Sequence, residues 1–143
     1  MKSLIIYSST DGQTKKICSF IIEYLKNKIF FDLVTIDEAF SLNLKNYEKI
    51  IIGASIRYGR YNSKLFKLVN KNLNILENKD CSFFSVNVVA RKPEKNTPET
   101  NPYIEKFLLN SKWKPKKISV FAGKVDYPNY NFLNKIIIKF IMY

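Results

Sequence analysis

The stretch from residue 4 to residue 14 constrains the fold of this chain more than any other. An apolar run at 4–7 is followed by a polar turn with three hydroxyl side chains, Ser9, Thr10 and Thr14, and then by a segment whose apolar residues have helical spacing. A strand that turns directly into a helix brings several backbone N–H groups to one place, and the positive end of the helix dipole adds to them. Gly12 permits a tight turn there. The stretch predicts an anion site, usually for phosphate; a capped helix start without a ligand is the alternative.

The rest of the chain alternates between strand-like and helix-like segments. Predicted strands cover residues 2–7, 29–36, 47–53, 82–89 and 117–123. Predicted helices cover 14–25 and 65–76 and begin again at 101–102, and the connection 37–45 has room for a short helix. The continuous apolar run 50–52 suits a parallel sheet covered on both faces. The alternation predicts one α/β domain, residues 1–143, with a parallel sheet between two layers of helices.

Composition narrows the function classes. The chain has 143 residues, a net charge of +12, two cysteines and no histidine. The lack of histidine rules out imidazole acid–base catalysis and disfavours a zinc site. The charge indicates an anionic partner such as lipid, unless it reflects only compositional bias, and without a recognised motif we expect no nucleic-acid partner. We also expect no signal peptide, no membrane-spanning helix and a reducing, cytosolic environment for Cys18 and Cys81.

The anion loop differs from the two common phosphate loops. It contains neither the Gly-Lys-Ser/Thr of a P-loop nor the G-x-G-x-x-G of a dinucleotide fold. It resembles the FMN-phosphate loop of flavodoxins, Ser/Thr-x-Thr-Gly-x-Thr, at Ser9, Gly12 and Thr14. Asp11 stands where flavodoxins usually have threonine, and a carboxylate beside a phosphate is repulsive. One explanation is that Asp11 points away from the anion and caps the helix.

Two later segments carry a more specific resemblance. Residues 52–59 read IGASIRYG, and residues 85–95 read SVNVVARKPEK. Both segments look like the flavodoxin-type, menaquinone-dependent protoporphyrinogen IX dehydrogenase family of bacteria. Further matches lie at residues 107–111, 113, 122–123, 127–130 and 139–142. The resemblance extends over the whole chain.

This resemblance implies a fold, a cofactor and a reaction. The fold is a flavodoxin-like, doubly wound sheet of strand order 2-1-3-4-5, with FMN at the carboxyl edge where the order reverses. The flavin, rather than a side-chain nucleophile or a metal, oxidises protoporphyrinogen IX to protoporphyrin IX. The electrons pass to menaquinone or ubiquinone, and the protein lies as a peripheral protein on the cytoplasmic face of the inner cell membrane. The implied cofactor-binding residues are Ser9, Thr10, Asp11, Gly12, Gln13, Thr14, Ala54, Ser55, Ile56, Arg57, Tyr58, Ser85, Val86, Asn87, Val88, Val89, Ala90 and Arg91.

Basic and aromatic side chains in the same loops are candidates for further contacts. The two propionates of a porphyrinogen suit guanidinium and ammonium groups, and a solvated basic rim is the alternative reading. The basic candidates are Arg57, Arg60, Arg91, Lys92 and Lys95. Tyr58 and Tyr61 are candidates for stacking on the flavin, against the alternative of ordinary half-buried loop aromatics.

The end of the chain differs from the family that it resembles. The family continues past the position of Tyr143, so the resemblance implies a shortened member, with 124–143 as the start of a family insertion and with weakened or lost activity as one consequence. Residues 131–143 predict an apolar helix of about 20 Å, too short to cross a bilayer, which lies on an anionic membrane or packs on the domain. Two other functions stay open: a flavodoxin electron carrier, although such carriers look acidic, and a non-enzymatic remnant that binds an anion or a membrane.

Overall fold

Five parallel strands form the centre of the molecule. The structure, a computed structural model, describes residues 2–8 and 12–122. The strands are β1 (Lys2–Ser8), β2 (Phe31–Thr35), β3 (Tyr47–Ser55), β4 (Asp80–Val86) and β5 (Lys117–Phe121). They form one sheet in the order β2-β1-β3-β4-β5, and every neighbouring pair is parallel. The predicted fold class and strand order are therefore confirmed.

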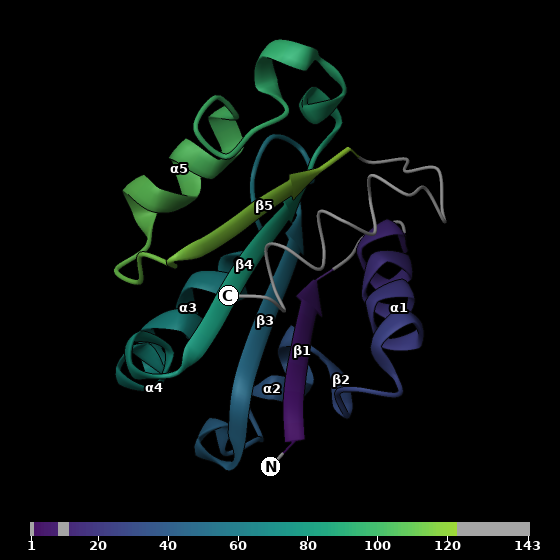
Figure 1. Cartoon of the computed structure of the whole chain (residues 1–143). Helices are drawn as coiled ribbons and strands as arrows, with labels where there is room; N and C mark the ends of the chain where they lie inside the picture. The colour runs from purple at the N-terminus through teal and green to yellow at the C-terminus, as the bar shows by residue number, and fades with distance from the viewer. Residues whose placement is uncertain (1, 9–11, 123–143) are drawn as a thin grey trace.

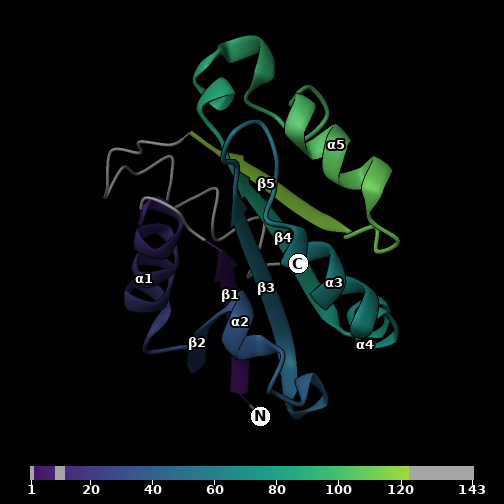
Figure 2. The same ribbon diagram turned by 180° about the vertical axis from the view of Figure 1, so that it is seen from behind.

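Helices cover both faces of the sheet (Figures 1 and 2). The α-helices are α1 (Gln13–Leu25), α2 (Ile36–Ala39), α3 (Ser63–Lys71), α4 (Leu73–Asn78) and α5 (Pro102–Asn110). Among the described residues, α1 is the one helix on its face, and the other four lie on the opposite face. Residues 124–143, including the predicted helix 131–143, lie outside the described part of the chain.

On the α1 face of the sheet, the apolar residues that predicted this helix form its buried stripe. Ile17, Ile21 and Leu25 recur one and two turns apart, and all three are buried against the sheet. They pack with Ile5 of β1 and Ile51 of β3. Burial of one such side chain contributes roughly 1.5–3 kcal/mol, so this stripe holds α1 across the strands from which the predicted site loops emerge.

The other face is held by stacked aromatic rings. The Phe107 ring of α5 lies 4.0 Å from the Phe83 ring of β4, centroid to centroid, with an interplanar angle of 11°. Trp113 meets Phe107 edge-on at 6.3 Å. All three side chains are buried. This packing fixes α5 over β4. The start of α5 also contacts the loops that follow β3 and β4.

Several predicted boundaries differ from the structure; for example, the strand predicted over 47–53 continues to Ser55, and the strand predicted over 117–123 ends at Phe121. The strand predicted to end at Val89 ends at Val86. Asn87 N–H still donates to Phe121 O of β5, but residues 88–91 then form a 3₁₀ turn, η2. The helix predicted over 65–76 is two helices, and the break lies at Asn72, whose N–H donates to Leu68 O and Val69 O. The second strand begins at 31 rather than 29. At residues 29–30, 73–76 and 88–89, apolar residues extend beyond the point at which the strand or helix begins or ends.

Asp80, at the start of β4, connects three strands through ion pairs. Its carboxylate oxygens lie 3.2 Å from Lys49 Nζ of β3 and 2.7 Å from Lys117 Nζ of β5. Burial alone would raise the pKa of this carboxyl, but the hydrogen bond from Lys117 and the charge of Lys49 outweigh burial and hold the pKa below its ordinary value of 3.8. The stabilisation is therefore present above pH 3.8 and is lost as the pH falls through the lowered pKa.

We expect Asp80→Asn to lower the free energy of unfolding at neutral pH by at most about 1 kcal/mol, because the site is partly exposed and solvent screens the pairs. The difference from the wild type should vanish in acid, as measured by urea unfolding. Glu23→Gln is the control, since it breaks an exposed pair with Lys26 at 2.8 Å and should change little. A deficit of Asp80→Asn that is the same in acid would contradict the ion-pair explanation.

Candidate functional site

The carboxyl ends of β1, β3 and β4 meet at one edge of the sheet. The chain leaves β1 toward α1 on one face and leaves β3 toward α3 on the other, so a crevice opens between the two connections. Two pockets lie in this crevice. They share Ser8, the last residue of β1, and Asn62, the residue before α3, so they adjoin.

The start of α1 is built for an anion. Gly12 is the N-cap residue, and its φ of +86° lies in the left-handed region that favours glycine. No side chain of residues 2–8 or 12–122 caps this helix, and Lys15 and Lys16 occupy its first turn, against the helix dipole. A negative charge at this end would interact favourably with both the helix dipole and the lysines.

The Thr14 hydroxyl is the sharpest feature of this helix start. Thr14 is 0% exposed, and its Oγ1 has no hydrogen-bond partner among the described residues. Burying a hydroxyl without a partner costs about 1–3 kcal/mol, so such atoms are rare in proteins. The threonine was predicted to bind phosphate, and an unpartnered hydroxyl in the first turn of α1 fits that role.

The first pocket lies beside this helix start. It has a volume of about 320 Å³. Its lining residues are Tyr7, Ser8, Gly12, Lys15, Thr35, Ile36, Asp37 and Asn62. Lys15 and Asn62 were not predicted as site residues; the sequence signals for them are a lysine in the first turn of a helix and an asparagine just before one.

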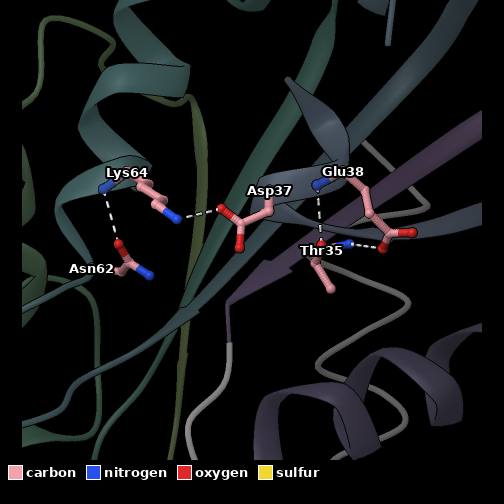
Figure 3. A network of polar contacts seen from close by, with 5 residues as sticks. All are labelled: Thr35, Asp37, Glu38, Asn62 and Lys64. Carbon is pink, nitrogen blue, oxygen red and sulfur yellow. Dashed lines mark hydrogen bonds and ion pairs between the residues drawn. The ribbon is translucent and has the colours of Figure 1, made fainter. Parts of the chain in front are cut away.

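Figure 3 shows the polar contacts that hold the far wall of this pocket. Thr35 and Glu38 form a capping box: Glu38 N donates to Thr35 Oγ1 at 3.1 Å, and Thr35 N donates to Glu38 Oε1 at 2.9 Å. These bonds hold the pKa of the Glu38 carboxyl below its ordinary value. Lys64 Nζ pairs with Asp37 at 2.7 Å, and Asn62 Oδ1 accepts from Lys64 N at 2.9 Å. The lysine thus neutralises the acidic residue that would otherwise oppose an anion in the pocket.

The second pocket extends along the end of β3. It has a volume of about 480 Å³. Its lining residues are Ser8, Ser55, Arg57, Tyr58, Arg60, Tyr61, Asn62 and Ser63. Four of the predicted site residues, Ser55, Arg57, Tyr58 and Arg60, therefore come together here. Arg91 and Lys92 are exposed but do not line either of the two pockets.

A tight hairpin turn presents the arginines of this pocket. Arg57 N donates to Arg60 O at 2.9 Å, and Arg60 N donates to Arg57 O at 3.1 Å. The two residues between them have positive φ, +51° at Tyr58 and +75° at Gly59, as in a type I′ turn. A left-handed tyrosine is strained by roughly 1–2 kcal/mol. The two backbone hydrogen bonds of the turn offset this strain. The turn leaves Tyr58 85% exposed, and the Arg57 guanidinium lies 5.0 Å from the centroid of its ring.

The predicted residues of the third loop are mostly buried. Ser85, Val86, Asn87 and Ala90 are buried, whereas Val88 is 65% exposed. Ala54 of β3 is also buried in the core. None of these residues lines either of the two pockets, and Ser85 and Asn87 are hydrogen-bonded to each other. Tyr61, a candidate for stacking, is 5% exposed and lies edge-on to Phe66, Phe83 and Phe107, so it is a core residue.

Thiol chemistry and metal binding have little support from the described residues at this edge of the sheet. The cysteines, Cys18 and Cys81, line neither pocket; burial raises the pKa of both thiols, that of Cys81 to about 12, so both are protonated at neutral pH. Within residues 2–8 and 12–122, no group of three or more His, Cys, Asp or Glu side chains could hold a metal ion. Over the same residues, no helix is both long and apolar enough to cross a membrane.

Comparison with known proteins decides the family. Residues 4–143 match a family described as flavodoxin domain. The protoporphyrinogen IX dehydrogenase (quinone) of Escherichia coli K12 is 44% identical, over 99% of this chain and 79% of that protein. The chain belongs to the protoporphyrinogen IX dehydrogenase family. The member from Leishmania major is also 44% identical, over 99% of this chain and 62% of that protein.

A solved structure agrees on the fold. Flavodoxin 1 from Bacillus cereus superposes with a TM-score of 0.63 at 15% identity, covering 97% of this chain and 95% of that one. The protoporphyrinogen IX dehydrogenases are oxidoreductases, and this chain combines membership of that family with the doubly wound flavodoxin fold. The predicted family, fold and enzyme class are thereby confirmed.

Proposed function

We propose that the protein binds FMN in the crevice at the carboxyl edge and uses it to oxidise protoporphyrinogen IX, with a quinone as the electron acceptor. The related proteins carry this substrate and acceptor in their names. The main observation in favour of FMN as the cofactor is the Thr14 hydroxyl at the start of α1, which has no hydrogen-bond partner among the described residues. When bound, FMN supplies the group that takes up the electrons of the porphyrinogen and returns them to the quinone.

The phosphate would be held at the start of α1. Thr14 Oγ1 donates to it, Gly12 lets the backbone approach, and Lys15 adds a positive charge at the adjoining pocket. Ser9, Thr10 and Asp11 lie outside the described residues, and their contacts with the phosphate stay predictions. Tyr58, which is exposed beside the second pocket, is the side chain we assign to the flavin ring.

The porphyrinogen carboxylates would meet Arg57 and Arg60. These two arginines face each other across the hairpin, and like charges at such positions repel. Neither makes an ion pair with another described residue. A substrate carboxylate between them would relieve the repulsion and accept several charge-assisted hydrogen bonds. We therefore assign propionate binding to this pair ahead of Arg91 and Lys92.

The net charge of +12 supports a membrane site for the quinone. Each lysine or arginine near an anionic lipid surface contributes about 1 kcal/mol to binding, so a strongly basic protein is attracted to it. We propose a peripheral location on the cytoplasmic face of the cell membrane, where menaquinone or ubiquinone would be available. The predicted membrane helix 131–143 lies outside the described residues.

Replacing Thr14 with valine tests the phosphate site, because stability and affinity should move in opposite directions. Valine has nearly the same shape and lacks the unpartnered hydroxyl, so the FMN-free protein should become more stable by about 1 kcal/mol. The affinity for FMN should fall about 10- to 100-fold, since a hydrogen bond to a charged group is typically worth about 1.5–3 kcal/mol. Thermal unfolding and titration of flavin fluorescence measure the two effects.

Ser119→Ala is the matched control for Thr14→Val. Ser119 Oγ is the other buried side-chain oxygen without a partner among the described residues, and it lies in the middle of β5, away from both pockets. Its removal should also stabilise the protein but leave the FMN affinity unchanged. If Thr14→Val binds FMN as tightly as the wild type, Thr14 does not serve the cofactor.

A further inference from the structure

A buried chain of hydrogen bonds joins the loops that follow β3 and β4. It consists of Tyr61, Ser85, Asn87 and Asn101, which we call the loop clasp. The Tyr61 hydroxyl lies 2.9 Å from Ser85 Oγ and 2.9 Å from the Tyr103 carbonyl oxygen, to which it donates. Asn87 Nδ2 donates to Ser85 Oγ at 3.0 Å. All four clasp residues are buried, so these bonds are shielded from water.

Asn101 is the centre of the loop clasp. Its Oδ1 accepts from Tyr103 N at 3.0 Å and from Ile104 N at 3.4 Å, which caps α5. The same oxygen accepts from Asn87 Nδ2 at 3.2 Å, and Asn101 Nδ2 donates back to Asn87 Oδ1 at 3.0 Å. Asn101 Nδ2 also donates to Lys95 O at 2.8 Å. A serine or aspartate would cap the helix equally well, so the amide is needed for the two bonds that it donates.

A second contact ties α5 to the hairpin. Lys106, one turn after the start of α5, donates from Nζ to Gly59 O at 2.9 Å. Gly59 is the last central residue of the turn that presents Tyr58 and separates Arg57 from Arg60. The first two turns of α5 therefore contact the loop after β3 through Lys106 and the loop after β4 through Asn101.

We propose that Asn101 and Lys106 are positioning residues, which set the two loops on either side of the flavin at a fixed separation. This inference rests on the proposed FMN site. Neither residue lines the two pockets of the crevice, so each acts on the cofactor only through the loop that it holds. The aromatic packing of Phe107 on Phe83 makes α5 rigid enough for this role.

Asn101→Asp separates capping from positioning. The carboxylate still accepts from Tyr103 N and Ile104 N, but it cannot donate to Asn87 Oδ1 or Lys95 O and places a charge against the former. We expect the FMN dissociation constant to rise at least about tenfold and the visible circular dichroism of bound flavin to change. Lowering the pH should restore both in part, because a protonated carboxyl can again donate one hydrogen bond.

Asn43→Asp is the control for the substitution itself. Asn43 caps the 3₁₀ turn η1 (Leu44–Asn46) by accepting from Lys45 N at 3.1 Å, and it lines neither pocket of the crevice. This variant should bind FMN as the wild type does, with the same flavin spectrum. Unfolding of each variant is measured in parallel, so a general loss of stability is recognised.

Lys106→Met provides a second test if Asn101→Asp does not fold. Lys106 is exposed, so methionine should not disturb the fold, yet it cannot donate to Gly59 O. We expect about a threefold weaker FMN affinity and an altered flavin circular dichroism, whereas Lys112→Met, at another exposed lysine, should change neither. A wild type that binds no FMN would overturn the proposed function. A wild type that binds FMN, together with folded Asn101→Asp or Lys106→Met variants of unchanged affinity and spectrum, would overturn the positioning role.

Discussion

Gly12→Val is expected to reduce the affinity for FMN more than about 100-fold while the protein stays folded. The φ of +86° costs a β-branched residue roughly 1–3 kcal/mol, so the helix start would relax away from the geometry that gathers its N–H groups. A Cβ at this position would meet no atom of residues 2–8 or 14–122 within 4 Å, so these parts of the FMN-free fold leave room for the side chain. The substitution should therefore weaken anion binding rather than prevent folding. Titration of flavin fluorescence measures the loss of FMN affinity.

Gly12→Asn is the informative partner of this variant. Asparagine adopts left-handed backbone more readily than other non-glycine residues, so it should retain part of the affinity that valine loses. Both variants should stay folded, with Gly12→Val the less stable of the two because the positive φ strains valine more. Wild-type affinity in Gly12→Val would show that the phosphate does not approach the backbone at this turn.

The double variant Arg57→Gln/Arg60→Gln is expected to raise the KM for protoporphyrinogen IX about 100-fold or more. A charge-assisted pair is typically worth about 1.5–3 kcal/mol, and each substitution removes one guanidinium from the second pocket. Both side chains are exposed, so the stability of the fold should change little. Steady-state kinetics with FMN-saturated protein measure the effect.

Arg91→Gln is the matched control for the arginine pair. Arg91 was an equal candidate on sequence grounds, but it does not line the second pocket. Its substitution should raise KM by less than about threefold, within the small effect of an exposed charge. If the double variant instead loses FMN affinity at an unchanged KM, the pair serves the cofactor and the assignment to the substrate is wrong.

The sequence predicted the strands and helices well because they follow repeating patterns, whereas the strand order came from the resemblance to flavodoxins. Buried parallel strands are continuous apolar runs, and the stripe of α1 recurs at helical spacing, so both are visible without tertiary information. The same logic misplaced the end of β4, since Val88 and Val89 continue the apolar run after the chain has left the sheet. It also joined α3 to α4, because the leucine stripe continues through Asn72, whose side chain donates to Leu68 O and helps to end the helix.

The candidate site was predictable only in part, because some of its contacts join residues that lie far apart in the sequence. Residues in the first turn of α1 and at the ends of strands can be assigned from local patterns, as Gly12, Thr14 and Arg57 were. Tyr61 could not be placed, because its orientation is decided by packing against Phe107 on a distant helix. Lys106 meets Gly59 across 47 positions of the chain, and nothing near either residue in the sequence signals that contact.

Anaerobic mixing of the FMN-loaded protein with protoporphyrinogen IX tests the central claim most directly. With the FMN-loaded protein in several-fold excess, because each flavin accepts only part of the electrons that one porphyrinogen loses, we expect the visible absorbance of oxidised flavin to bleach as the porphyrin absorbance appears. Added menaquinone should restore the flavin band. Riboflavin, which lacks the phosphate that the α1 site would hold, should not replace FMN in this experiment. A protein that binds FMN but is not reduced by protoporphyrinogen IX would instead be an electron carrier, and that result would contradict the proposed function.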